Sequence, residues 1–356
     1  MRNRKRWRSF PFDPGRGRLG TSLPLAALPA GTRTGDLPVP YRIVVPLDGS
    51  RFGERALPLA LSVAERTGGS LELITIAVPV VQSAGGRDAA VTGDDSGDRG
   101  EVRARAYLDE VADRIRVAGY EGALVRDVIS PGNAARSIVR RVAEVEADLV
   151  IMTTHGRGPL QRAWLGSTAD GVIRRSPCPV LLVRPPDALA ETEPEDRPPI
   201  DLSARPGPFS RVVIPLDGSE AAERAFDSLP PLLAEGATAH LLRIVAPFVA
   251  GGSPYLPHTV REAQDHEMVR RASAEYLDRF RGRVEASGFV AEPEVVTGGQ
   301  PAVAILRASE SLGAGLIAMS TSGRGGAARL LLGSVADKVV RGAPCPVLLS
   351  RTPEDA

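Results

Sequence analysis

The sequence predicts an α/β fold made of two tandem, doubly wound domains, each with a five-stranded parallel sheet of Rossmann-like type. Two observations predict it. The same blocks of sequence occur twice in one order, and within each copy short apolar runs alternate with segments of helical periodicity. Apolar strands that alternate with helices form parallel sheets covered on both faces. Right-handed crossovers then give a doubly wound sheet, which binds ligands beyond the carboxyl ends of its strands.

The repeat is visible at four places. RIVVPLDGS at 42–50 matches RVVIPLDGS at 211–219, an offset of 169 residues. The later blocks match at an offset of 167 residues: GNAARSI with GQPAVAI, HGRGPLQRAWLGSTAD with SGRGGAARLLLGSVAD, and SPCPVLLV with APCPVLLS. Matching blocks in one order, with a net change of two residues, indicate a tandem duplication.

The duplication divides the chain. Residues 41–184 and 210–351 are the two expected domains. Residues 185–209 are an expected linker, because they are rich in proline and acidic residues and lack periodicity. Residues 1–40 are expected to be a disordered tail. The basic residues near its start are interpreted either as a solvated charge run or as a nucleic-acid contact.

The elements of the first domain are predicted in chain order. They are a strand at 43–47, a helix capped by Ser50, a strand at 71–78, a helix with Leu108, Val111, Ala112 and Ile115 on one face, a strand at 124–129, a helix at 134–145, a strand at 149–153, a short helix from Ser167 and a strand at 180–183. The second domain repeats this order, and its second helix places Ala272, Tyr276, Leu277, Phe280 and Val284 at helical spacing.

Two features of the elements have consequences for the assembly. Pro230 and Pro231 fall inside the first helix of the second domain, which is therefore expected to end early or kink. The last strands, 180–183 and 347–349, are apolar and would otherwise leave exposed sheet edges. We expect them to pair and to join the two domains into an intramolecular pseudo-dimer.

Composition limits the classes of function. The 356 residues carry a net charge of +1, with 43% hydrophobic and 24% charged residues, as in ordinary soluble proteins. No overall field attracts nucleic acid or a membrane, and no apolar stretch reaches the roughly 18 residues of a membrane span. We expect a cytoplasmic protein with neither partner. Cys178 and Cys345 occupy equivalent Pro-Cys-Pro-Val phrases and are expected to be small buried residues that enter a strand.

A glycine-rich loop follows the fourth strand of each domain. Gly156 is followed by nine residues and then Gly166-Ser167-Thr168, and Gly323 by nine residues and then Gly333-Ser334. Glycines let a backbone approach a ligand closely, and the free N–H groups of a helix start favour phosphate. The alternative is that these glycines only form turns in a long connection.

A carboxylate follows the first strand of each domain, in Pro46-Leu47-Asp48 and in Pro215-Leu216-Asp217. Doubly wound folds bind ligands at this edge, and a carboxylate there suits ribose hydroxyls. The alternative is a helix cap shared with the adjacent serine.

Four segments in one order resemble the universal stress protein family in its tandem form, over residues 41–184 and 210–351. They are VVPLDGS, a G-x-P-A segment, HGRG…LGS and PCPVLLV. The resemblance implies an adenine nucleotide alpha hydrolase-like fold and antiparallel pairing of the last strands. Members that bind ATP carry glycine, two residues, glycine, nine residues, glycine and then serine or threonine. This chain departs at the first glycine, where it has Thr153 and Ser320.

The resemblance also implies the ligand, ATP with or without Mg²⁺, and its contacts. Aspartate would meet ribose or adenine, the main chain of the second strand would meet the adenine edge, and a glycine before the third helix would border the ribose. The expected nucleotide-binding residues are Pro46, Asp48, Ile76, Gly132, Thr153, Gly156, Gly166, Ser167 and Thr168 in the first domain, and Pro215, Asp217, Ile244, Gly299, Ser320, Gly323, Gly333, Ser334 and Val335 in the second.

These patterns favour an ATP-binding regulatory protein of the stress response, with an unidentified protein partner and an optional homodimer. No GxxxxGK[ST] loop or G-x-S-x-G elbow is present, the histidines lack metal-site spacing, and Asp48 and Asp217 are taken as the only repeated acid–base residues. An enzyme is therefore disfavoured. The alternatives are an interaction module with vestigial pockets and a weak ATP hydrolase. If only one site is occupied, Pro301 and an additional loop glycine favour the second domain as the ATP site.

Overall fold

The structure is a computed structural model. It describes residues 41–78, 95–154, 165–184, 200–245, 260–321 and 332–351. The expected tail at 1–40, most of the expected linker, and the loop residues Gly156 and Gly323 lie outside the described residues. Within the described part of the chain, no helix is both long enough and apolar enough to cross a membrane.

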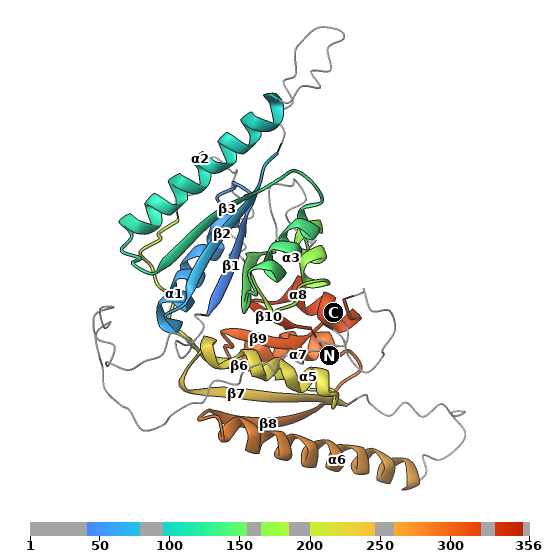
Figure 1. The fold of residues 1–356 in the computed structure, drawn as a ribbon. Helices are drawn as coiled ribbons and strands as arrows, with labels where there is room; N and C mark the ends of the chain where they lie inside the picture. Colours follow the sequence, from blue (N-terminus) through green and yellow to red (C-terminus); the bar gives the residue numbers. More distant parts are fainter. Residues whose placement is uncertain are drawn as a thin grey trace, which may run out of the picture. The chain divides into compact units, whose positions relative to one another are not determined.

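The first domain follows the predicted order of elements (Figure 1). They are β1 (Arg42–Leu47), the 3₁₀ helix η1 (Gly53–Ala56), α1 (Leu57–Thr67), β2 (Ser70–Ile76), α2 (Asp95–Val117), β3 (Ala123–Ile129), α3 (Ala134–Glu144), β4 (Leu149–Thr153), α4 (Ser167–Ile173) and β5 (Val180–Val183).

The second domain repeats this order with one alteration near its start. Its elements are β6 (Phe209–Pro215), α5 (Glu220–Arg224), the 3₁₀ helices η4 (Ala225–Ser228) and η5 (Pro230–Leu232), β7 (Leu233–Val245), α6 (Val260–Glu285), β8 (Val290–Thr297), α7 (Pro301–Ser311), β9 (Leu316–Ser320), α8 (Ser334–Gly342) and β10 (Val347–Ser350). The predicted early end of the first helix is confirmed, because α5 gives way to 3₁₀ turns before Pro230.

All ten strands belong to one sheet, in the order β3-β2-β1-β4-β5-β10-β9-β6-β7-β8. Within each domain every pairing is parallel, as predicted. The two halves meet at β5 and β10, which pair antiparallel, with Leu181 opposite Leu348. The antiparallel pairing expected of these last strands is therefore present, and it covers two apolar edges.

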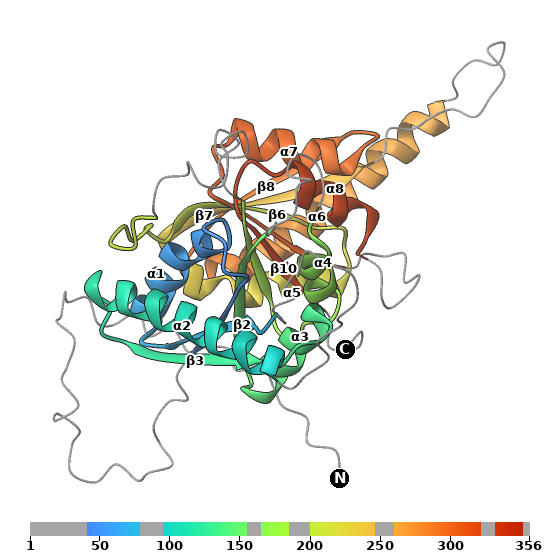
Figure 2. The ribbon, with the colours of Figure 1, turned by 90° about the horizontal axis from the view of Figure 1, so that it is seen from above.

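The strands are apolar runs because both of their faces are buried. Along β1, Ile43 and Val45 pack into one hydrophobic cluster, and Val44 between them packs into another. The first cluster lies under α1, α2, α5 and α6, and the second lies under α3, α4, α7 and α8. Figure 2 shows these helices on the two faces of the sheet. Each cluster contains residues of both domains.

Some boundaries and burial predictions need correction. Strand β2 ends at Ile76 rather than Val78, whose side chain is exposed. On α6, Ala272 is exposed and Ser273 is buried, so the apolar face is turned by one residue at that end. Cys178 is buried as expected, whereas Cys345 is only half-buried.

Candidate functional site

Each domain has one topological switch point. From β1 the chain crosses through α1 to β2, whereas from β4 it crosses through α4 to β5 on the other side. β1 and β4 are neighbours, so the loops at their carboxyl ends diverge and leave a crevice of the kind that binds ligands. β6 and β9 form the equivalent point in the second domain. The predicted residues from both strands converge at these two places.

The turn after β1 is built around Asp48. Its Oδ1 accepts hydrogen bonds from the backbone N–H of Ser50 at 3.0 Å and from the Ser50 hydroxyl at 2.6 Å. Gly49 between them has a φ of 77°, which favours glycine. The Ser50 hydroxyl oxygen in turn accepts from the backbone N–H of Gly53 at 3.0 Å. The Ser50 hydroxyl thus satisfies the first N–H of η1, but the N-cap of η1 is Phe52 and that of α1 is Ala56, so the prediction that Ser50 caps the next helix is wrong. The Asp48 side chain is exposed.

The second domain builds the same turn. Oδ1 of Asp217 accepts from the backbone N–H of Ser219 at 2.9 Å and from its hydroxyl at 2.6 Å, and Gly218 has a φ of 83°. Ser219 caps α5 by accepting from the backbone N–H of Ala222 at 3.2 Å. Asp217 is half-buried, whereas Asp48 is exposed.

Strand register brings the second strand to the same edge. Leu47 pairs with Thr75, so Asp48, one residue further on, lies level with Ile76 at the end of β2. In the second domain Pro215 pairs with Leu242, which places Asp217 level with Ile244. The exposed Gly132 and Gly299 lie in the connections to α3 and α7 at this edge.

The start of α4 supplies hydrogen-bond donors. Gly166 is the N-cap; its N–H donates to the carbonyl oxygen of Thr154 at 2.9 Å, and its own carbonyl oxygen accepts from Asp170. No described residue accepts from the backbone N–H of Ser167 or Thr168, as expected at a helix start. α8 repeats this arrangement with Gly333, Ser334 and Val335.

The two N-cap glycines are not required by backbone conformation. Gly166 has a φ of −60° and Gly333 a φ of −56°, which any residue adopts. Space is the constraint at Gly333, where an added Cβ would lie 3.1 Å from the carbonyl oxygen of Thr321. Thr153 and Ser320, which replace the first glycine of the family's pattern, end β4 and β9 and are both buried.

Sequence reasoning missed a polar cluster beneath this turn in the first domain. Glu54, whose side chain is 5% exposed, pairs with Nη1 of Arg114 at 2.9 Å. The Tyr107 hydroxyl donates to Oε1 of Glu54 at 3.2 Å. Burial raises the pKa of Tyr107, and the nearby Glu54 and Asp48 carboxylates raise it further. The cluster therefore lies between α2 and the turn that carries Asp48.

The same three residue types recur in the second domain as Glu223, Tyr276 and Arg283, each at an offset of 169 residues. The interpretation of Asp48 and Asp217 as the only repeated acid–base residues is therefore wrong. Two short identities carried the signal: Glu-Arg-Ala at 54–56 and 223–225, and Tyr-Leu-Asp at 107–109 and 276–278. They are too short to stand out without the spatial contact that joins them.

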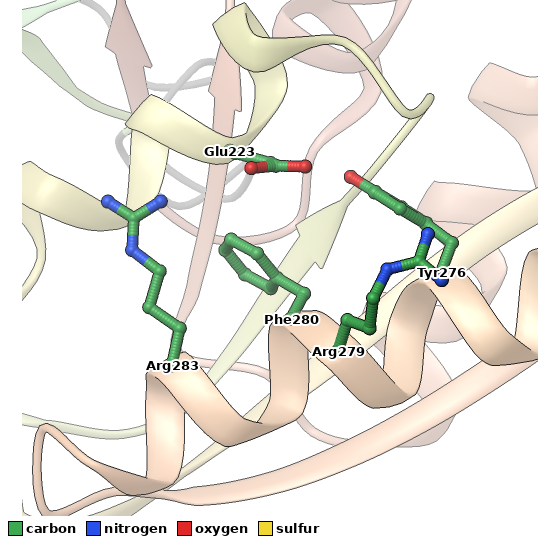
Figure 3. Close-up of a pocket in the computed structure, with 5 residues that line it drawn as sticks. All are labelled: Glu223, Tyr276, Arg279, Phe280 and Arg283. Atoms are coloured by element: carbon green, nitrogen blue, oxygen red, sulfur yellow. The ribbon is translucent and has the colours of Figure 1, made fainter.

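The second domain holds its cluster differently (Figure 3). The Tyr276 hydroxyl points toward the Glu223 carboxylate, but Arg283 turns away and pairs with Asp227. A cavity of about 250 Å³ opens there, lined by Glu223, Tyr276, Arg279, Phe280 and Arg283. In the described part of the chain no arginine forms an ion pair with Glu223.

The polar groups around these switch points are carboxylates and backbone N–H donors. Among the described residues, no group of three or more His, Cys, Asp or Glu side chains is placed to hold a metal ion. Carboxylates at the strand ends and N–H donors at the helix starts lie on opposite sides of each switch point.

Comparison with known families identifies both halves of the chain. The model of the universal stress protein family matches residues 41–184 and again residues 208–351. The chain belongs to this family. It is a tandem member, since the family model matches twice within one polypeptide.

Relatives support the tandem form. The universal stress protein Rv1996 of Mycobacterium tuberculosis is 26% identical over 329 residues, which cover 88% of this chain and 96% of that protein. The universal stress protein MJ0531 of Methanocaldococcus jannaschii is 33% identical over 150 residues, which cover 41% of this chain and 84% of that protein.

Solved structures show the fold. A universal stress protein from Archaeoglobus fulgidus matches with a TM-score of 0.55 and 19% identity, covering 87% of this chain and 98% of that chain. PA1789 from Pseudomonas aeruginosa, described as functionally unknown, matches with a TM-score of 0.58 and 18% identity, covering 88% of this chain and 93% of that chain. This universal stress protein therefore has the Rossmann-like, adenine nucleotide alpha hydrolase-like fold, twice.

Proposed function

We propose that this universal stress protein is a cytoplasmic, ATP-binding regulatory protein and not a dedicated enzyme. The nucleotide lies at the carboxyl ends of the strands, at one or both switch points. The observation that carries the proposal is the convergence, in both domains, of the aspartate turn after the first strand with the helix start after the fourth.

The described residues fit ATP in two ways. The carboxylates of Asp48 and Asp217 follow the first strand, where they would accept hydrogen bonds from ribose hydroxyls. The N–H groups at the starts of α4 and α8 would receive phosphate oxygens, with help from the helix dipole. When Mg²⁺ accompanies the nucleotide, it would neutralise phosphate charge.

Native mass spectrometry of freshly purified protein tests the proposal most directly. We expect a mass increment for adenine nucleotide on part of the chains. Calorimetric titration of nucleotide-free protein with ATP, with and without Mg²⁺, should then show binding with at most two sites per chain. Absence of both signals would contradict the proposal and favour the alternative, an interaction module with vestigial pockets.

The protein partner and a homodimer remain predictions. A regulatory role requires that ATP change the affinity for a partner, because a ligand shifts an equilibrium only by its differential affinity. Pull-down from the native lysate with and without ATP, followed by sizing of the complexes, checks this. ADP release on incubation with ATP separates slow hydrolysis from binding alone, and we expect far slower release than nucleotide exchange.

A further inference from the structure

The turn that carries the site aspartate is connected to the cluster behind it by hydrogen bonds and one ion pair. In the first domain Asp48 holds Ser50, and the carbonyl oxygen of Ser50 accepts from the backbone N–H of Glu54 at 3.2 Å. The Glu54 side chain is then held by Tyr107 and Arg114 on α2. Whatever fixes Glu54 therefore also limits the movement of Asp48.

The main chain of this turn is equivalent in the second domain. The carbonyl oxygen of Ser219 accepts from the backbone N–H of Glu223 at 3.3 Å, and Asp217 holds Ser219 as Asp48 holds Ser50. The difference between the domains lies in the side chains that receive the glutamate, not in the turn.

One substitution distinguishes the surroundings of the two arginines. The position of Asp227 is occupied by Pro58 in the first domain, so Arg114 has Glu54 as its acidic partner there. In the second domain Asp227 captures Arg283, and the cavity lies where the arginine would otherwise reach Glu223. Phe280 forms part of the lining, and the guanidinium of Arg283 lies 5.6 Å from the centre of its ring.

We propose that Glu54, Tyr107 and Arg114 are positioning residues that hold the nucleotide turn of the first domain, and that Asp227 loosens the second site by capturing Arg283. The inference rests on the proposed function. It assigns the better-ordered site to the first domain and names one exposed carboxylate as the determinant of the difference.

Each site is studied alone by disabling the other in the full chain. In the Gly333→Val background, Tyr107→Phe and Glu54→Gln should weaken ATP binding about threefold to tenfold in calorimetric titration, since the first removes the hydrogen bond to Glu54 and the second removes the charge that pairs with Arg114. Arg114→Lys, which keeps the charge, should retain most of the affinity. Unchanged affinity in Tyr107→Phe and Glu54→Gln would overturn the assignment.

The decisive variant is expected to gain affinity for ATP rather than lose it. In the Gly166→Val background, Asp227→Asn should strengthen ATP binding at the second site about threefold, because Arg283 is released toward Glu223. The gain should vanish when Glu223→Gln is added. Asp278→Asn, which changes an exposed carboxylate on α6, the helix that carries Arg283, is the matched control and should leave affinity unchanged. A gain that persists without Glu223, or no gain at all, overturns the role of Asp227.

Hydrogen exchange of nucleotide-free protein separates this inference from the proposed function. The backbone N–H groups of Gly53 and Glu54 report opening of the first turn, and those of Ala222 and Glu223 report the second. We expect faster exchange in the second turn, faster exchange in the first turn of Tyr107→Phe, and slower exchange in the second turn of Asp227→Asn. If these exchange rates are found while no variant binds ATP, the proposed function fails and the turn is still held as described. Equal exchange in both turns overturns the inference itself.

Discussion

The second strands of the two domains carry different polar residues at one equivalent position. Glu72 pairs in register with Val44, and His240 pairs in register with Val213. Nε of Arg141, on α3, donates a hydrogen bond to the Glu72 carboxylate at 2.6 Å. His240 instead receives a carboxylate from the neighbouring strand, since its Nδ1 lies 3.0 Å from Glu292.

The partners have changed together with the strand residue. Ala308 occupies the place of Arg141 in the second domain, and Val125 occupies the place of Glu292 in the first. A buried polar group without a partner is strongly destabilising, so a change on the strand must be matched by a change on whichever element faces it. At this position the duplicated domains have diverged by a pair of residues.

The first helices show a different kind of divergence. α1 runs unbroken from Leu57 to Thr67, whereas its counterpart is divided before Pro230. The segment before β6 packs on α1, where the Ser62 hydroxyl donates to the carbonyl oxygen of Pro206 at 2.6 Å. Only the first domain therefore has a long helix under the connecting segment.

The largest expected effect on nucleotide binding is at the starts of α4 and α8, where we expect the phosphates to bind. Gly166→Val should remove nucleotide from the first site and Gly333→Val from the second, with losses of affinity above roughly 100-fold, because a branched side chain at the N-cap blocks the approach of phosphate. Calorimetric stoichiometry should fall by one site for each variant. Gly207→Val, where an added Cβ meets nothing, is the control for folding. Unchanged stoichiometry would show that the nucleotide binds elsewhere.

The ion pair between Arg141 and Glu72 has no equivalent in the second domain. Removal of Arg141 should therefore destabilise the first domain. Arg141→Met leaves the nearly buried Glu72 without its partner. It should lower the free energy of unfolding, measured by urea titration, by about 2 kcal/mol. The loss is smaller than for a fully buried pair because the arginine side chain is 28% exposed. Arg140→Met, whose side chain is 68% exposed, should change it by less than about 0.5 kcal/mol. Adding Glu72→Leu to Arg141→Met should restore most of the loss; no recovery would argue against the pair as the cause.

The two aspartates should differ in their contribution to nucleotide binding. Asp48→Ala is expected to lower the affinity of its site about tenfold and Asp217→Ala about threefold, because only the first turn is anchored by a complete cluster. This order is the reverse of the one that Pro301 and the additional loop glycine predict. Nucleotide bound per chain, measured for each variant by mass spectrometry, decides between them. A greater loss in Asp217→Ala would mean that the phosphate loop outweighs the turn.

The smallest expected difference is at the equivalent cysteines. Burial raises the pKa of Cys178 to about 12 and that of Cys345 to about 11, from an ordinary value of 9.0. Both thiols are therefore protonated in the folded protein at pH 8, and alkylation by iodoacetamide should be slower than in urea. Cys345 should react first as the pH rises, since its thiol ionises at lower pH and it is half-buried rather than buried. Peptide mass spectrometry measures both rates, and equal rates would contradict the difference in burial.

The sequence by itself determined the features that depend on periodicity and on repetition. Apolar runs located the strands, the repeated Asp-Gly-Ser marked the ends of the first strands, and Pro230 predicted the broken helix. The exact register of the strands could not be predicted, only that their carboxyl ends share one edge of the sheet. That was enough to place Asp48 and Gly166 at one switch point.

Tertiary structure decided which side chains meet across elements. Glu54 and Tyr107 are 53 residues apart, and their contact follows from the way α2 packs on the turn after β1. The choice of Arg283 between two carboxylates depends on the position of Asp227 in space, since hydrogen bonds and ion pairs act over a few ångströms and are not encoded in periodicity. The two domains are therefore alike in what local pattern specifies and differ where packing selects the partner.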